Sequence, residues 1–221
     1  MTQTFSQRIL DLFFPPRCPF CSRLLQDREE LCLACRKELS QLHSPAPQQG
    51  SYGICVSALP YKSIVRSAIL QYKFSGKSGR AKPFAALMAP VIARELGGQF
   101  DTVSFVPVHP LRRLSRGYDQ SYLLCRELCR LWNCKPAVLL KKRRNTKPNS
   151  SLSHASARRG NVLGAFIVPH PDLVYGRHIL LIDDILTTGS TLAECVRLLR
   201  DAGAAHVVCA TLAAAEGSDK P

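Results

Sequence analysis

The sequence contains no apolar run long enough to cross a lipid bilayer as a helix. Such a span needs about 20 consecutive apolar residues, and the longest candidate, residues 207–215, is far shorter and suits a core strand better. The apolar segment 9–14 contains Asp11 and stops at two prolines, with no small-residue cleavage site behind it. It therefore lacks the pattern of a secretory signal peptide, and we expect a cytoplasmic protein.

Acidic residues are scarce. The chain has 16 Asp and Glu against 30 Lys and Arg, which gives a formal net charge of +14. This excess indicates a polyanionic partner, with solubilising surface charge as the alternative. Two phosphate-binding signatures are also missing, the G-x-x-x-x-G-K-[ST] loop and the G-x-G-x-x-G turn. Ordinary P-loop nucleotide hydrolases and dinucleotide-dependent enzymes are therefore disfavoured.

Two Cys-x-x-Cys pairs lie near the N-terminus, formed by Cys18, Cys21, Cys32 and Cys35. Each pair turns two thiolates toward one point, and four thiolates make the closed tetrahedral site of structural zinc. A redox-active pair is the alternative, but the motif occurs twice and no βαβ pattern surrounds it. We expect residues 1–50 to form an N-terminal helix and a four-cysteine zinc-binding domain that ends in a linker. Residues 51–221 are expected to form a second domain.

The second domain alternates predicted strands and helices, which is typical of an α/β fold with a parallel sheet. Strands are expected at 52–59, 102–106, 165–168, 178–182 and 207–212, and helices at 64–72, 83–96, 123–131 and 192–202. Residues 179–182 are all isoleucine or leucine, without polar alternation. This segment is therefore expected to be a strand buried on both faces, as parallel sheets require.

Two carboxylates, Asp183 and Asp184, stand where that strand is expected to end. A hydroxyl-rich turn follows and leads into the next helix, with the residues Thr187, Thr188, Gly189, Ser190 and Thr191. Backbone amides, hydroxyls and a helix N-terminus together suit a phosphate monoester. Adjacent carboxylates can accept hydrogen bonds from two vicinal hydroxyls or hold a divalent cation. Phosphate beside a diol indicates a ribose 5-phosphate.

Two further segments are strongly basic. The first is a polar, proline-containing stretch, expected to be a loop, with the basic residues Lys141, Lys142, Arg143, Arg144 and Lys147. It is interpreted as a lid over an anionic ligand, a strip that follows a nucleic-acid backbone, or a solvated loop. The second, residues 112–121, is expected to be a turn that can hold phosphate or simply be solvated. His109, just before it, is a weak catalytic candidate.

These motifs together resemble a known family. Residues 182–191 match the phosphoribosyl pyrophosphate (PRPP) binding motif of type I phosphoribosyltransferases throughout. The wider set is similar to the ComF family of competence-associated, phosphoribosyltransferase-like proteins. It comprises the paired cysteine motifs, Tyr72-Lys73, and residues 106–108, 116–120 and 158–166. The resemblance covers most of the chain from Cys18 to Leu212.

The resemblance implies the Rossmann-like parallel sheet of type I phosphoribosyltransferases, with a flexible hood and a small N-terminal zinc-binding domain. It implies that Asp183 and Asp184 contact the ribose hydroxyls and Mg²⁺, while the turn at 187–191 binds the 5-phosphate. Lys73 and Arg116 are weaker candidates for the pyrophosphate end. It further implies a role in natural transformation, with PRPP, single-stranded DNA and other DNA-uptake proteins as partners.

Three functions remain open from the sequence. The first is a PRPP-binding competence protein that contacts single-stranded DNA through residues 141–144 and 147 and the zinc domain. The second is a true phosphoribosyltransferase, in which Mg²⁺ neutralises the departing pyrophosphate and Asp183 and Asp184 are the catalytic candidates. No stretch of sequence indicates its base-recognition pocket. The third is a sensor that binds PRPP without turning it over.

Overall fold

A computed structural model describes residues 15–26, 29–74, 76–146 and 160–215. The expected N-terminal helix, Lys147 and the pair Arg158-Arg159 lie outside these ranges. Within them, no helix is long and apolar enough to cross a membrane.

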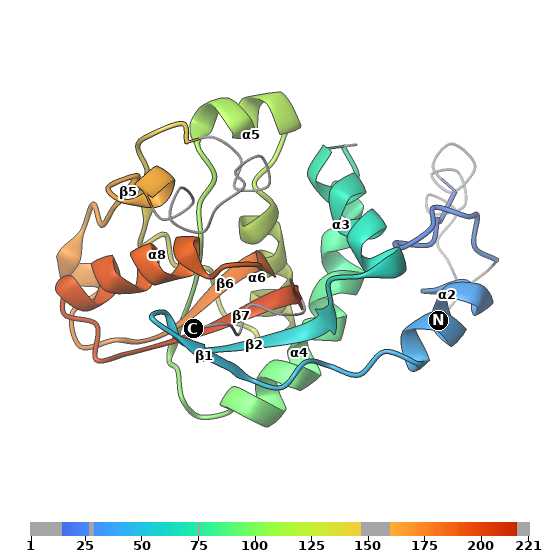
Figure 1. The fold of residues 1–221 in the computed structure, drawn as a ribbon, viewed down its shortest axis with the longest axis horizontal. Helices are drawn as coiled ribbons and strands as arrows, with labels where there is room; N and C mark the ends of the chain where they lie inside the picture. The colour runs from blue at the N-terminus through green and yellow to red at the C-terminus, as the bar shows by residue number, and fades with distance from the viewer. Residues whose placement is uncertain (1–14, 27–28, 75, 147–159, 216–221) are drawn as a thin grey trace.

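Five strands form the central sheet, in the order β1-β2-β7-β6-β3 (Figure 1). Strands β2, β7, β6 and β3 run parallel to one another, so the expected parallel sheet is confirmed. The first strand pairs antiparallel with β2 at one edge and was expected to be part of the linker. The bounds are β1 Gln48–Gly50, β2 Gly53–Pro60, β3 Thr102–Phe105, β6 His178–Leu186 and β7 His206–Ala214.

Helices cover both faces of this sheet (Figure 1). One face carries α3 (Ser63–Phe74), α4 (Ala81–Leu96) and α6 (Gln120–Leu131), with the short 3₁₀ helix η1 (Ser78–Arg80) between α3 and α4. The other carries α8 (Ser190–Asp201) and a small sheet of β4 (Lys141–Lys142) and β5 (Phe166–Ile167). A second 3₁₀ helix, η3 (Pro171–Leu173), precedes β6.

Strand β6 shows why both faces must be covered. Its side chains alternate between the two cores, as a period of two requires. Leu180 and Ile182 pack into the core beneath α4 and α6, whereas Ile179 and Leu181 pack into the core beneath α8. None of the four is exposed. The expectation of a strand buried on both faces is thus confirmed, and pairing with β3 on one side and β7 on the other places β6 in the interior of the sheet.

Two basic segments differ from what the sequence predicted. Residues 110–116, assigned mainly to a turn, form the short helix α5 (Pro110–Arg116). His109 caps its start by accepting a hydrogen bond from the Leu111 amide at 3.3 Å, and Gly117 ends it in a left-handed conformation with φ of 82°. Lys141 and Lys142, expected in a loop, pair with β5 as a strand. Both segments were missed because their apolar residues are too few to show a period.

Candidate functional site

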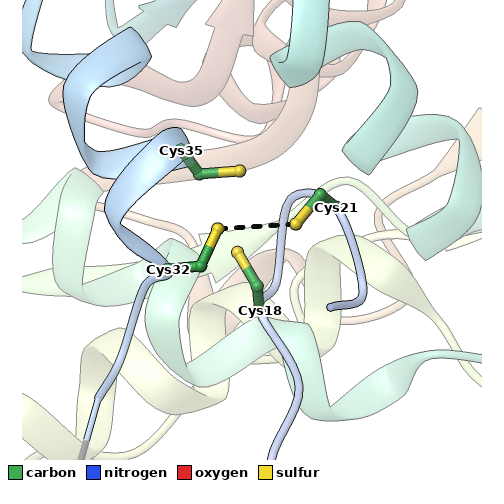
Figure 2. A group of neighbouring side chains, drawn as sticks. All are labelled: Cys18, Cys21, Cys32 and Cys35. Carbon is green, nitrogen blue, oxygen red and sulfur yellow. Dashed lines mark hydrogen bonds between the residues drawn. The ribbon is translucent and has the colours of Figure 1, made fainter. Parts of the chain in front are cut away.

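The four cysteines of the two Cys-x-x-Cys motifs meet in one cluster (Figure 2). Cys32 and Cys35 stand at the start of α2 (Leu33–Ser40), and Cys18 and Cys21 lie on the facing turn. All four sulfurs lie within 4.8 Å of one another, and the Cys21 and Cys32 sulfurs are 3.6 Å apart. Tetrahedral zinc with bonds of about 2.3 Å separates its thiolates by about 3.8 Å, so the cluster fits a structural zinc ion.

Backbone amides surround the Cys18 sulfur. Burial alone would raise the pKa of this thiol, but hydrogen bonds from the amides of Cys21, Cys32 and Phe20 outweigh it and lower the pKa to about 7. Thiolates are the form that binds zinc. These hydrogen bonds therefore favour the metal-binding form of Cys18.

The zinc-binding segment is attached to the second domain. Phe20 packs edge-on against Phe84 of α4, with the ring centroids 5.6 Å apart. The Ser22 hydroxyl donates to Gln71 of α3 at 3.1 Å and accepts from the Arg80 guanidinium at 2.7 Å. The segment thus braces α3, the helix that ends at the carboxylate pair described next.

The carboxylates and the hydroxyl-rich turn lie at the C-terminal end of β6, which continues through both aspartates to Leu186. Gly189 has a φ of 69°, which side chains disfavour. A Cβ added there would overlap the ring of Tyr52, so only glycine fits. Ser190 then begins α8, and its hydroxyl lies 2.9 Å from that of Thr188. A small cavity is lined by Asp183 and by residues 185–192, which include the turn.

Asp183 and Asp184 differ in their surroundings. Oδ1 of Asp183 accepts hydrogen bonds from the Ser121 hydroxyl at 2.9 Å and the Asp184 amide at 2.8 Å. Burial, and then the neighbouring charge of Asp184, raise the pKa of Asp183 to about 7. Asp184 instead forms an ion pair with Lys73, at 2.8 Å. The site therefore contains Asp184, whose carboxylate is paired with Lys73, and Asp183, whose carboxyl group binds a proton more readily than usual when no metal ion is present.

Lys73 and Arg116, both candidates for the pyrophosphate end, are placed differently. Lys73 contacts Asp184 directly from the C-terminal end of α3. Arg116 donates to the Gln120 side-chain oxygen at 3.0 Å, and its guanidinium lies over the Phe74 ring, 4.8 Å from the centroid. Gln120 is fully buried, and in the described part of the chain its amide nitrogen has no hydrogen-bond partner. Buried donors without a partner are uncommon in folded proteins.

Three residues of the site were not singled out individually from the sequence. Ser121 supports Asp183, Tyr52 packs against Gly189, and Gln120 joins Arg116 to the start of α6. Gln120 and Ser121 lie within the segment 112–121 singled out from the sequence, but no individual role was predicted for them. Asp119 caps α6 by accepting from the Tyr122 amide at 3.0 Å and accepts from the Val108 amide at 2.9 Å. It holds the segment that places Gln120 and Ser121.

The residues of the basic stretch have different surroundings in the structure. Lys142 is partly buried, and its ammonium lies 4.8 Å from the centroid of the Phe166 ring. Arg144 donates to the carbonyls of Asn161 and Leu163 and so holds the segment that follows residue 160. Lys141 and Arg143 are exposed. The four residues therefore do not form one uniform basic strip.

A parallel sheet with a carboxylate pair and a glycine-containing hydroxyl turn at the end of an interior strand defines a phosphoribosyltransferase-type domain, here with a zinc-binding segment attached. Two family models agree. The phosphoribosyl transferase domain matches residues 114–221, and the double zinc ribbon domain matches residues 9–49.

Comparison with curated proteins identifies the family within this class of domain. The chain is 33% identical to DNA utilization protein YhgH of Escherichia coli O157:H7 over 208 residues, which cover 88% of this chain and 90% of that protein. It is 31% identical to competence protein ComFC of Streptococcus pneumoniae, covering 81% and 78% of the two chains. A solved allosteric regulatory enzyme of purine biosynthesis is 21% identical over 59% of this chain and 25% of its own, with a TM-score of 0.40. The chain belongs to the ComF/YhgH family of phosphoribosyltransferase-like proteins.

Proposed function

We propose that this protein binds PRPP at the C-terminal end of β6. The observation that carries the proposal is the juxtaposition of Asp183 and Asp184 with the turn at 187–191, whose glycine is held in a left-handed conformation at the start of α8. Amides at a helix start favour phosphate, and carboxylates beside them favour the ribose diol or a cation. The turn would hold the 5-phosphate and the aspartates the ribose.

The donor set also fits Mg²⁺. Both aspartates supply carboxylate oxygens, the ligands that Mg²⁺ prefers, and substrate phosphates usually complete its shell. When bound, the ion would neutralise charge on the pyrophosphate. Asp183 and Asp184 would hold it, while Lys73 keeps the second carboxylate in place through their 2.8 Å ion pair. Arg116 remains a candidate for the pyrophosphate end.

We further propose that the protein handles incoming single-stranded DNA on the cytoplasmic side during DNA uptake, together with other DNA-uptake proteins. Two observations support this. The relatives are named for DNA utilization and competence. A net charge of +14 also exceeds what one small anionic ligand requires. Lys141 and Arg143 are exposed and are the members of the basic stretch most available to a phosphate backbone.

Calorimetric titration with PRPP, with and without Mg²⁺, tests the first proposal. Asp183→Asn and Asp184→Asn each remove one charge from the site and should weaken Mg²⁺-dependent binding at least tenfold. The matched control is Asp101→Asn, because Asp101 lies at the opposite end of the sheet, where it accepts from the His178 amide. Binding by both site variants at wild-type strength would contradict the assignment.

Turnover separates the alternatives. If the protein is a true phosphoribosyltransferase, pyrophosphate should appear when PRPP and Mg²⁺ are supplied with a nucleobase or an amine. If it senses PRPP, the ligand should bind and remain intact, with single-stranded DNA absent or present. A change of PRPP affinity on addition of single-stranded DNA would favour the competence function, because it would show that the two ligands meet on one protein.

A further inference from the structure

A recess lies between the C-terminal end of α3 and helix α5. Its volume is about 420 Å³, and its walls are formed by Phe74, Gly76, Arg112, Ser115 and Arg116. It is separate from the small cavity of the hydroxyl-rich turn. Lys73, which pairs with Asp184, is the neighbour of Phe74 along α3. On its other wall, Arg116 bonds to Gln120, whose neighbour Ser121 bonds to Asp183.

The recess presents an aromatic ring to solvent. The side chain of Phe74 is 65% exposed although it lies at the end of a helix whose other apolar residues are mostly buried. The guanidinium of Arg116 lies over its ring, at 4.8 Å from the centroid. An exposed ring beside a planar cation is the arrangement on which unpaired nucleic-acid bases stack. The face of the ring that Arg116 leaves open is available for such a base.

The recess also carries positive charge from two arginines. Arg112 and Arg116 both line it, and burial together with the charge of Arg116 lowers the pKa of Arg112. Among the described residues, no carboxylate forms an ion pair with either guanidinium. Arg112 donates instead to the carbonyl of Thr146. A phosphate between the two guanidinium groups would relieve their repulsion and accept charge-assisted hydrogen bonds.

We propose that this recess binds one unpaired nucleotide of a single-stranded DNA. Phe74 stacks on the base, and Arg112 and Arg116 hold the adjacent phosphate, so that DNA and the pyrophosphate of PRPP would share Arg116. A phosphate alone would not need the exposed ring, and a duplex would not offer it a free base face. The inference rests on the proposed handling of single-stranded DNA. It extends that function by placing part of the strand between α3 and α5 rather than on the basic stretch alone.

The test compares two ligands with the same backbone, a fluorescent thymidine pentamer and a pentamer of abasic deoxyribose phosphates. Stacking on one aromatic side chain is worth roughly 1–3 kcal/mol per base, or about five- to 150-fold in affinity. Phe74→Ala should therefore weaken binding of the thymidine pentamer by a factor in this range and leave the abasic pentamer unaffected. Phe74→Tyr keeps the ring and should restore binding.

Arg112→Ala should weaken both pentamers and lower the slope of log affinity against log salt by about 0.7, the value for one phosphate contact on a single strand. Arg94→Ala removes the same charge from the surface of α4, where Arg94 pairs with Glu95, and is the matched control. Leu114→Ala controls for apolar area, because Leu114 is 82% exposed on α5 outside the recess.

Equal binding of the thymidine pentamer by wild type and Phe74→Ala would overturn the subsite. So would an equal loss for both pentamers in Phe74→Ala, because that pattern reports a structural defect rather than stacking. These outcomes leave the proposed function intact as long as wild type binds a 30-nucleotide thymidine strand. Failure of wild type to bind the long strand would remove the DNA function itself, and with it the subsite.

Discussion

Replacing Asp183 by Asn should raise the free energy of unfolding of the ligand-free protein. The same substitution should abolish Mg²⁺-dependent binding of PRPP. Asp183 lies at the end of β6 with the charge of Asp184 beside it, and its pKa is raised from 3.8 to about 7. Its Oδ1 accepts from the Ser121 hydroxyl and the Asp184 amide, and the amide oxygen of Asn can accept both bonds. The substitution therefore removes a disfavoured charge without removing a required acceptor.

The sign follows from proton binding. Between pH 4 and pH 7 the folded protein holds a proton on Asp183 that the unfolded chain has released, so the free energy of unfolding falls as the pH rises. Between pH 5 and pH 8, Asp183 of the folded protein keeps its proton over about two pH units. Each of these units lowers the free energy of unfolding by about 1.4 kcal/mol. The stabilisation by Asp183→Asn should thus grow by roughly 2–3 kcal/mol over this interval. All other titrating groups are common to both proteins and largely cancel.

Urea unfolding of both proteins at pH 5, 6, 7 and 8 measures the difference. The buffer should contain no Mg²⁺, which would stabilise the charged form, and no chelator, which would remove zinc. Asp101→Asn is the control of opposite sign. Burial would raise the pKa of Asp101, but hydrogen bonds from Thr102 and His178 outweigh it and lower the pKa. That variant should lose stability at pH 8.

A stabilisation by Asp183→Asn that is the same at pH 5 and pH 8 would refute this reasoning, as would a loss of stability at pH 8. The expected combination is a more stable protein that no longer binds PRPP with Mg²⁺. This combination would also show that lost binding in the variant does not come from unfolding, since the two properties change in opposite directions.

Three other sets of substitutions test particular contacts. Gly189→Ala should cost at least about 1 kcal/mol of stability and most PRPP affinity; Gly98→Ala, also at positive φ but with no atom within 4 Å, should cost stability alone. Cys35→Ser should lower bound zinc, measured by mass spectrometry, and a folded wild-type protein without zinc would contradict the ligand assignment. Reversing the charges of Lys141 and Arg143 should weaken binding of single-stranded DNA and flatten its salt dependence, and unchanged affinity and slope would exclude these residues.

Several features follow from the sequence by itself, because they depend on neighbours along the chain. Two Cys-x-x-Cys turns indicate four zinc ligands, and the structure gathers their sulfurs within 4.8 Å. The run at 179–182 has no polar position, so its strand must be covered on both faces. The order of Asp183, Asp184 and the turn at 187–191 places carboxylates and helix amides together. Helix α5 was missed because it buries no residue and so leaves no apolar period.

Only the tertiary structure decided which elements meet at these motifs. Periodicity shows which side chains face a core, but it does not show which helix packs against which strand. Lys73 reaches Asp184 and Ser121 reaches Asp183 because α3 and α6 adjoin the end of β6. The ring of Tyr52, from the β1–β2 turn, fills the space beside Gly189. The recess of Phe74 and Arg112 likewise exists only because α3 and α5 end side by side. Motifs specify a ligand type locally, whereas packing decides what surrounds the ligand.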